Sequence, residues 1–311
     1  MRAMPLRLAA GDATVTLLPA LGGAIGSFTI GAQDVLRPTP PEALAAGNVR
    51  ATACYPLVPY SNRIAAAALH LPDGTRHALA RNFGDHPHAI HGVGWQRAWD
   101  VAHAEAARAL LSFEHRPVGD GARAWPFAFR ATQAFALAAD GDRATLDASL
   151  AIESTDPRPF PFGLGWHPFF PRDDATRLGF GATAVWETDD TRLPTRHVAA
   201  DGPWRFDPSR TISDVTLDHV FTGWDGRATL GRRRQGLAVS IEADTALACL
   251  VVYVPAGRDF LAVEPVTHIT DAFNRMARGE PGTGTRTLDP GAAYSCRMRV
   301  TCARMSATSI P

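Results

Sequence analysis

The chain has 311 residues, of which 46% are hydrophobic and 20% are charged, so it can bury a substantial core and is not a disordered polypeptide. Its 31 basic and 31 acidic side chains give a formal net charge of zero, which leaves no basic excess for binding nucleic acid or an anionic membrane. All 31 basic residues are arginine. The absence of lysine excludes Schiff-base catalysis, pyridoxal-phosphate attachment and a P-loop lysine.

The cysteines and the N-terminus indicate a reducing compartment. None of the four cysteines belongs to a Cys-x-x-Cys pair, so neither a zinc site nor a redox motif is indicated. The first ten residues are too short in apolar length for a signal peptide, and no run approaches the ~18 apolar residues of a membrane span. We therefore expect a cytoplasmic protein that meets no membrane and no nucleic acid, with a neutral polar small molecule as its partner.

Period-two alternation of apolar and polar residues dominates the chain. Residues 127–137, 144–152 and 294–302 each place apolar side chains on one face, which predicts strands with one buried face. Residues 247–254 are apolar throughout, which is typical of a central strand covered on both sides. Residues 40–46 form the best helical candidate, and glycine- and proline-rich turns separate the other segments. We expect one large antiparallel β domain, a sandwich, over residues 1–311.

Two clusters of polar residues stand in the first third of the chain. Residues 55–64 hold two prolines, which are followed by Asn62 and Arg63. The arginine offers five N–H donors for hydroxyl or carboxylate oxygens. An arginine in a surface loop would look the same. The second cluster contains His86, His88 and His91.

Three neighbouring histidines suggest a metal, but no cysteine or carboxylate stands at a zinc-site spacing from them. We therefore expect no metal, and take His86 and His88 as ordinary loop residues. His91 is followed by Gly-Val-Gly. Glycines let the backbone approach a ligand closely, so this histidine is a candidate for binding.

His167 and Glu264 each stand immediately before a proline. A residue before proline is pushed into an extended conformation, which holds each side chain on a stiff, strand-like support. An imidazole gives or takes a proton near neutral pH, and a carboxylate is a natural general base. Apolar neighbours should raise the pKa of the glutamate above about 4.3. The two residues are candidates for paired acid–base chemistry, although a hydrogen-bonded core histidine and an arginine-paired glutamate fit the same pattern.

Two weaker candidates complete the set. Asp218 lies in Leu-Asp-His-Val-Phe, which in isolation indicates a turn aspartate. Trp95 and Trp166 adjoin the clusters above and are candidates for stacking on sugar rings, whereas we expect most of the seven tryptophans in the core.

In chain order, these segments resemble the aldose 1-epimerase (galactose mutarotase) family, in its bacterial-type branch. The resemblance rests on Asn62-Arg63, His91-Gly92, the Gly-x-Gly-x-His-Pro-Phe-Phe segment, Leu-Asp-His-x-Phe, and Glu-Pro-x-Thr followed by Asp-Ala-Phe-Asn, and it covers roughly residues 15–300. It implies an all-β fold, a single large antiparallel β super-sandwich with few short helices. Phe169 stands where the family commonly has tyrosine.

The resemblance also implies an activity and roles. The protein would interconvert the α and β anomers of free aldoses, such as glucose or galactose, without cofactor or metal. Glu264 would take the proton from the C1 hydroxyl and His167 would protonate the ring oxygen. The hemiacetal then opens to an aldehyde, C1 rotates, and the ring closes on its other face. The candidates for sugar binding are Asn62, Arg63, His91 and Asp218, which match by motif, and Trp166 with its aromatic face.

Three alternatives remain open at this stage. A hexose-6-phosphate 1-epimerase needs a cationic pocket, which Arg63 alone does not supply. A glycosidase needs two carboxylates flanking the scissile bond; Asp218 and Glu264 could supply them, but His167 would then have no role. A non-catalytic carbohydrate-binding protein needs no acid–base pair. The preferred aldose, and whether the protein is a monomer or a homodimer, stay open.

Overall fold

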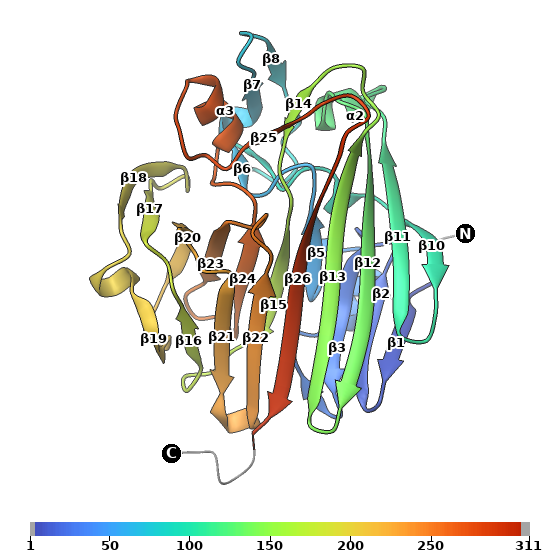
Figure 1. Cartoon of the computed structure of the whole chain (residues 1–311), viewed down its shortest axis with the longest axis vertical. Coiled ribbons are helices and arrows are strands. Elements are labelled where there is room, and N and C mark those ends of the chain that lie inside the picture. Colours follow the sequence, from blue (N-terminus) through green and yellow to red (C-terminus); the bar gives the residue numbers. More distant parts are fainter. Residues whose placement is uncertain (1–3, 306–311) are drawn as a thin grey trace.

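The computed structural model describes residues 4–305 and consists mostly of strands (Figure 1). Two large antiparallel sheets, of eleven and nine strands, enclose a continuous apolar core. Within the described residues the α-helices are short and few: α1 (Pro41–Ala45), α2 (Asp120–Ala124) and α3 (Ala272–Ala277). The expected all-β super-sandwich with few short helices is therefore confirmed, and α1 lies where the sequence predicted a helix.

The eleven-stranded sheet carries the residues of greatest interest. Its order is β1 (Leu6–Ala10), β2 (Ala13–Leu18), β3 (Ala24–Ile30), β5 (Cys54–Leu57), β15 (Gly165–Pro171), β24 (Phe260–Val266), β23 (Cys249–Val254), β20 (Leu217–Thr222), β17 (Ala184–Thr188) and β18 (Pro194–Ala199), with β4 (Gln33–Asp34) paired to β3.

The nine-stranded sheet is the layer at the front of Figure 1. Its order is β10 (Asp100–Ala104), β11 (Arg108–His115), β12 (Phe129–Asp140), β13 (Arg143–Ser154), β26 (Ala293–Arg304), β22 (Leu237–Ala243), β21 (Arg227–Arg232), β16 (Arg177–Phe180) and β19 (Phe206–Thr211). Three ribbons lie outside both sheets: β6 (Arg63–Ile64) with β9 (Ala89–Ile90), β7 (Ala68–His70) with β8 (Arg76–Ala78), and β14 (Phe160–Phe162) with β25 (Arg286–Leu288).

The alternation read from the sequence corresponds to the buried faces of these strands. The segments 127–137, 144–152 and 294–302 lie mainly in β12, β13 and β26, which are neighbours in the nine-stranded sheet. The apolar run 247–254 contributes β23, which lies between β24 and β20 as a central strand. Period-two patterns predict which face of a strand is buried because successive side chains point to opposite faces.

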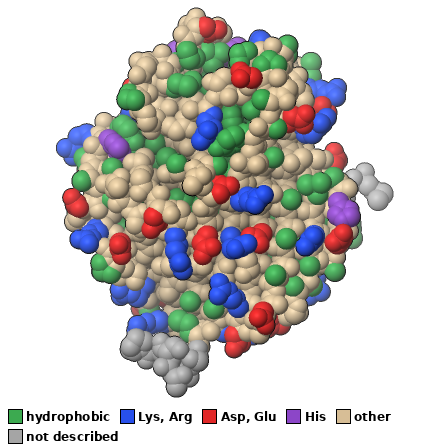
Figure 2. Space-filling model, in the orientation of Figure 1, with side chains coloured by type: hydrophobic (Ala, Val, Ile, Leu, Met, Phe, Trp, Pro, Cys, Tyr) green, Lys and Arg blue, Asp and Glu red, His purple; other side chains and the backbone are tan. Residues whose placement is uncertain are grey.

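The outward face of the nine-stranded sheet mixes charges of both signs. In the view of Figure 2, basic and acidic side chains are interspersed. Arg299 pairs across strands with Asp147 at 2.7 Å, and Arg130 pairs with Glu153 at 3.3 Å. This face therefore carries no large patch of one sign, in keeping with the zero net charge.

None of the helices within the described residues is long and apolar enough to cross a membrane. The four cysteines are buried and free.

Gly92 packs closely against the backbone of Val58, just after β5 of the eleven-stranded sheet. Gly92 has φ of +70°, and a Cβ atom there would lie 2.3 Å from the carbonyl oxygen of Val58. Gly141, in the turn between β12 and β13, has φ of +55° but no atom within 4 Å of such a Cβ. The two glycines share a left-handed backbone and differ in the space around them.

We expect Gly141→Ala to lower the free energy of unfolding by about 1–2 kcal/mol, the ordinary cost of a left-handed residue with a side chain. Gly92→Ala should lower it by about 3 kcal/mol or more, because the backbone at Val58 must also move. Denaturant unfolding of both variants measures the difference. Equal losses would contradict the close packing of this loop on Val58.

Candidate active site

His167 and Glu264 face each other across two central strands. In the β15–β24 register Gly165 is opposite Val266, and Phe169 is opposite Ala262, which sets His167 directly opposite Glu264. Cross-strand neighbours of this kind share a face and touch. Nε2 of His167 lies 3.2 Å from Oε1 of Glu264. Both residues lie in strands, so the extended backbone expected before proline is confirmed.

The neighbouring strands extend this row into a floor. Tyr55 of β5 is opposite His167, and Val251 of β23 is opposite Glu264. Residues two positions along the same strands point the same way. Phe169, Tyr253 and Asp218 therefore form the next row, with Asp218 of β20 opposite Tyr253. The sheet register alone positions all these side chains.

Two loop residues form one wall through reciprocal hydrogen bonds. The N–H of His91 donates to the carbonyl oxygen of Asn62 at 2.9 Å, and the N–H of Asn62 donates to Nδ1 of His91 at 3.0 Å. Both residues have positive φ, +57° for Asn62 and +63° for His91, which is uncommon outside glycine. Burial holds the pKa of His91 well below its ordinary value. Since Nδ1 accepts, the neutral ring carries its proton on Nε2 and can donate there.

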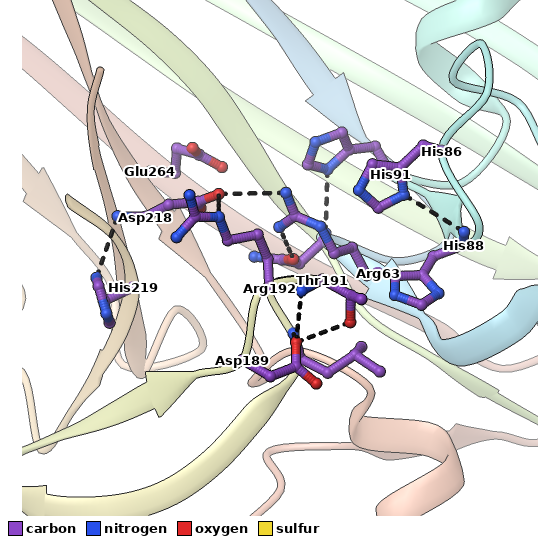
Figure 3. A network of polar contacts seen from close by, with 12 residues as sticks. Arg63, His86, His88, His91, Asp189, Thr191, Arg192, Asp218, His219 and Glu264 are labelled. Carbon is purple, nitrogen blue, oxygen red and sulfur yellow. Dashed lines mark hydrogen bonds and ion pairs between the residues drawn. The ribbon is translucent and has the colours of Figure 1, made fainter. Parts of the chain in front are cut away.

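An ion pair joins this loop to the sheet floor. Nη2 of Arg63 lies 3.2 Å from Oδ2 of Asp218, and Nη1 of Arg63 donates to Oδ1 of Asn62 at 3.0 Å. Arg192, from the loop between β17 and β18, approaches the same Asp218 oxygen at 3.8 Å (Figure 3). The amide nitrogen of Asn62 and the second carboxylate oxygen of Asp218 stay available to ligand hydroxyls.

These side chains line a cavity of about 570 Å³, a volume typical of small-molecule sites. The structure brings together six of the seven site residues proposed from sequence: Asn62, Arg63, His91, His167, Asp218 and Glu264.

A family model of aldose 1-epimerases matches residues 5–301 of the chain. The chain belongs to the aldose 1-epimerase family. It is similar to the uncharacterized protein YphB of Escherichia coli K12, with 28% identity over 278 residues, which cover 85% of this chain and 90% of that protein.

Solved structures show the same fold. A crystal structure of a candidate aldose 1-epimerase from Escherichia coli K12 superposes with a TM-score of 0.85 and 25% identity, over 97% of this chain and 99% of that one. A galactose mutarotase-like protein from Clostridium acetobutylicum gives a TM-score of 0.83 with 18% identity, over 97% and 95% of the two chains.

Trp166, the seventh candidate from sequence, does not line the cavity. Trp166 precedes His167 on β15, so its side chain points to the opposite face, where it is 1% exposed in the core. Trp95 is buried behind the site, with its ring 5.7 Å from that of Tyr55. The aromatic rings beside His167 are instead those of Phe169, stacked at 4.3 Å, and Tyr55, at 4.7 Å.

His86 and His88 lie outside the lining, as expected of loop residues. Nδ1 of His86 accepts from the N–H of His88, and Nδ1 of His88 accepts from the N–H of Ala66. Within residues 4–305 no three His, Cys, Asp or Glu residues are grouped to hold a metal ion.

Several residues that line the cavity were not among the candidates from sequence. Tyr253 carries the one hydroxyl group in the apolar run 247–254, and that hydroxyl is a signal that could have identified it. Tyr55 stands at the start of the proline-rich segment that was noticed for Asn62. No sequence signal distinguished the other lining residues, which include Arg37, Arg50, Phe83, Arg258 and Phe260.

Burial shifts the pKa values of Glu264 and His167 in opposite directions. It raises the pKa of Glu264 well above its usual range; the Asp218 carboxylate adds to the rise, and Arg63 opposes it. Burial also lowers the pKa of His167 to about 3, with the charge of Arg37 adding to the fall. Two groups in contact titrate as a unit. Between about pH 3 and the raised pKa of Glu264, the pair holds one proton, whichever of the two residues carries it.

Another buried histidine, His268, packs behind the site. His268 is 2% exposed; its Nδ1 donates to the carbonyl oxygen of Ile269 at 2.7 Å, and its Nε2 accepts from the N–H of Ser61, beside Asn62. Burial lowers the pKa of His268 from 6.5 to about 4. Below pH 6.5 the unfolded chain therefore binds a proton at this residue that the folded protein does not bind until about pH 4.

The free energy of unfolding should consequently fall as the pH drops from 6.5 to 4. His268 alone contributes up to about 1.4 kcal/mol per pH unit over this window. We expect His268→Gln to lower stability at pH 7 but to show a flatter decline, measured by denaturant unfolding between pH 7 and 4. An exposed-histidine control, His70→Gln, should keep the wild-type slope. An unchanged slope in His268→Gln would contradict the assignment of a neutral buried ring.

Proposed function

We propose that this protein is an isomerase, an aldose 1-epimerase (mutarotase) that interconverts the α and β anomers of an aldose by opening and reclosing its ring. The observation that carries the proposal is the 3.2 Å contact between His167 and Glu264 inside the cavity. Ring opening removes a proton from the C1 hydroxyl and delivers one to the ring oxygen. Both oxygens are bonded to C1, so the base and the acid must be neighbours.

The proton balance follows from the shared proton of the pair. With that proton on His167, the Glu264 carboxylate takes the proton of the C1 hydroxyl. The bond between C1 and the ring oxygen breaks, and the imidazolium protonates that oxygen as the aldehyde forms. After rotation at C1, His167 removes the proton from the former ring oxygen, which attacks the other face of C1. Glu264 then returns its proton to the aldehyde oxygen, and both groups regain their starting states.

The polar wall supplies donors and acceptors to hold the sugar during rotation. Nε2–H of His91 and the amide of Asn62 are donors of fixed orientation. The backbone N–H of Asn62 holds the His91 ring through Nδ1, and Arg63 holds the Asn62 amide through Oδ1. Arg63 and Asp218, joined by their ion pair, can bind adjacent hydroxyls as donor and acceptor. Fixed partners of this kind favour the productive geometry without reorganisation during the reaction.

The contact between His167 and Glu264 weighs against two other classes of function, a glycosidase and a non-catalytic carbohydrate-binding protein. A glycosidase would pair Glu264 with a second carboxylate across the bond to be cleaved. Here the partner in contact with Glu264 is an imidazole, and Asp218 is joined to Arg63. A carbohydrate-binding protein without activity gains nothing from two buried ionisable groups in contact, whose desolvation costs stability.

Polarimetry of freshly dissolved α-D-glucose and α-D-galactose tests the proposal. Wild type should speed equilibration over buffer, and Glu264→Gln and His167→Asn should each lower the rate constant by about 10²- to 10⁴-fold, the usual contribution of general acid–base catalysis. Two exposed residues supply matched controls. Glu153→Gln and His103→Asn should retain the wild-type rate.

Three results would count against the proposal. Retention of the rate in the folded Glu264 and His167 variants would remove the assigned roles. Release of sugar from an aryl glycoside would favour the glycosidase. Binding of sugars without any acceleration would favour the carbohydrate-binding protein.

A further inference from the structure

One end of the cavity gathers positive charge. Four arginines and two acidic residues line the cavity as a whole, and one of these arginines, Arg63, forms an ion pair with Asp218. Within residues 4–305, none of the other three, Arg37, Arg50 and Arg258, forms an ion pair with a carboxylate. The chain as a whole is neutral, so this local excess is a property of the site and not of the general surface.

Arg37 is held in a defined position. Its guanidinium lies 3.9 Å from the centre of the Phe169 ring and 4.4 Å from that of Phe260. Nη2 donates to the carbonyl oxygens of Arg50 at 3.1 Å and Thr52 at 2.9 Å, while Nε is buried without a partner. A half-buried guanidinium without a carboxylate is costly, and a bound anion would offset that cost.

The other two arginines come from separate segments and face the same cavity. Arg50 belongs to the short 3₁₀ turn Val49–Ala51, and its guanidinium lies 4.5 Å from the centre of the Phe83 ring. Arg258 is exposed in the loop between β23 and β24, two residues before Phe260. Asp259 acts electrostatically on Arg37 but lies beyond ion-pair distance of it.

The strand register places this cluster away from the reacting pair. Phe169 follows His167 by two residues and Phe260 precedes Glu264 by four, and both steps run in the same direction along the antiparallel strands. At about 3.3 Å per residue, Arg37 stacks between rings whose backbones are roughly 7 to 13 Å from the pair. A sugar with C1 at the pair can therefore direct its far end toward the arginines.

We propose that the preferred substrate is an aldose with an anionic group, a phosphate or a carboxylate, at the end remote from C1, and that Arg37, Arg50 and Arg258 bind this group. The inference rests on the proposed epimerase function and specifies its substrate class. Guanidinium groups match phosphate and carboxylate oxygens in planar, paired hydrogen bonds. The cationic pocket that a sugar-phosphate substrate requires, which Arg63 alone could not provide, is present in these three residues.

Occupancy of this end also bears on the chemistry. The charge of Arg37 contributes to the low pKa of His167. An anion bound to Arg37 neutralises that charge and makes His167 easier to protonate. The anionic group would thus favour protonation of His167 as well as binding. An anionic aldose should therefore have a higher kcat as well as a lower KM.

NMR magnetisation transfer between the α and β anomers of one sugar tests the inference. It would be measured separately for glucose, glucose 6-phosphate and glucuronate, at one ionic strength. Wild type should show kcat/KM at least about tenfold higher for one or both anionic sugars than for glucose, as charge-assisted hydrogen bonds warrant. In Arg37→Gln and Arg258→Gln the ratio of anionic to neutral kcat/KM should fall several-fold. Arg7→Gln, an exposed residue of β1 at the sheet edge, should keep the wild-type ratio.

The outcomes separate the two proposals. A preference for the phosphate alone or for the carboxylate alone identifies the anion. Equal acceleration of all three sugars would overturn the anion site while leaving the epimerase function intact, and acceleration of none would overturn both. A wild-type preference that survives in the arginine variants would contradict the assignment to these residues. Arg258→Gln keeps the test valid if Arg37→Gln folds poorly, because Arg258 is exposed.

Discussion

The pairing of β15 with β24 is the constraint on which the site depends. It sets His167 opposite Glu264, and through β5 and β23 it also aligns Tyr55 and Val251 with them. Each strand carries a proline next to its ionisable residue, which is unusual in central strands because proline cannot donate to the ladder. The rest of the sandwich provides the rigid sheet that keeps these side chains in register, and the loops add the wall of donors.

Burial gives this pair its chemical character. A carboxylate and an imidazole in water differ only modestly in their pKa values, and each exchanges protons with solvent. In the cavity, desolvation disfavours the charged form of each, so the pKa of Glu264 rises and that of His167 falls. The contact at 3.2 Å then lets one proton serve both groups. The proposed reaction needs one acid and one base at adjacent oxygens, and a pair that shares a proton meets both needs.

Local patterns predicted the strands and the stiff supports of His167 and Glu264, because alternation and the effect of proline act within a few residues. The same patterns made the two residues candidates for paired chemistry. Their contact across β15 and β24 depends on the pairing of segments far apart in sequence, which local patterns do not determine. Trp166 was proposed as a sugar contact because of its neighbours. The alternation of a strand, applied to His167, would have placed Trp166 on the opposite face.

The arginines at the end of the cavity remote from His167 and Glu264 show a different limit of prediction from sequence. Arg37, Arg50 and Arg258 lie in turns and loops with no motif around them, in a chain where every basic residue is arginine. Net charge suggested a neutral partner because it averages over the whole surface. The fold places Arg37 and Arg50 against phenylalanine rings and adds Arg258 to the lining of the same cavity. This concentration of charge depends on the tertiary arrangement of segments that are far apart in sequence.

A double-mutant cycle on His167 and Glu264, the proposed acid–base pair, tests the central claim most directly. The rate of anomer exchange would be measured for wild type, Glu264→Gln, His167→Asn and the double variant, all confirmed as folded. If the two residues act as one proton-sharing unit, the double variant should be about as slow as either single variant, because losing one partner already disables the pair. Losses that multiply in the double variant would contradict the account, since they would mean that the two groups contribute independently.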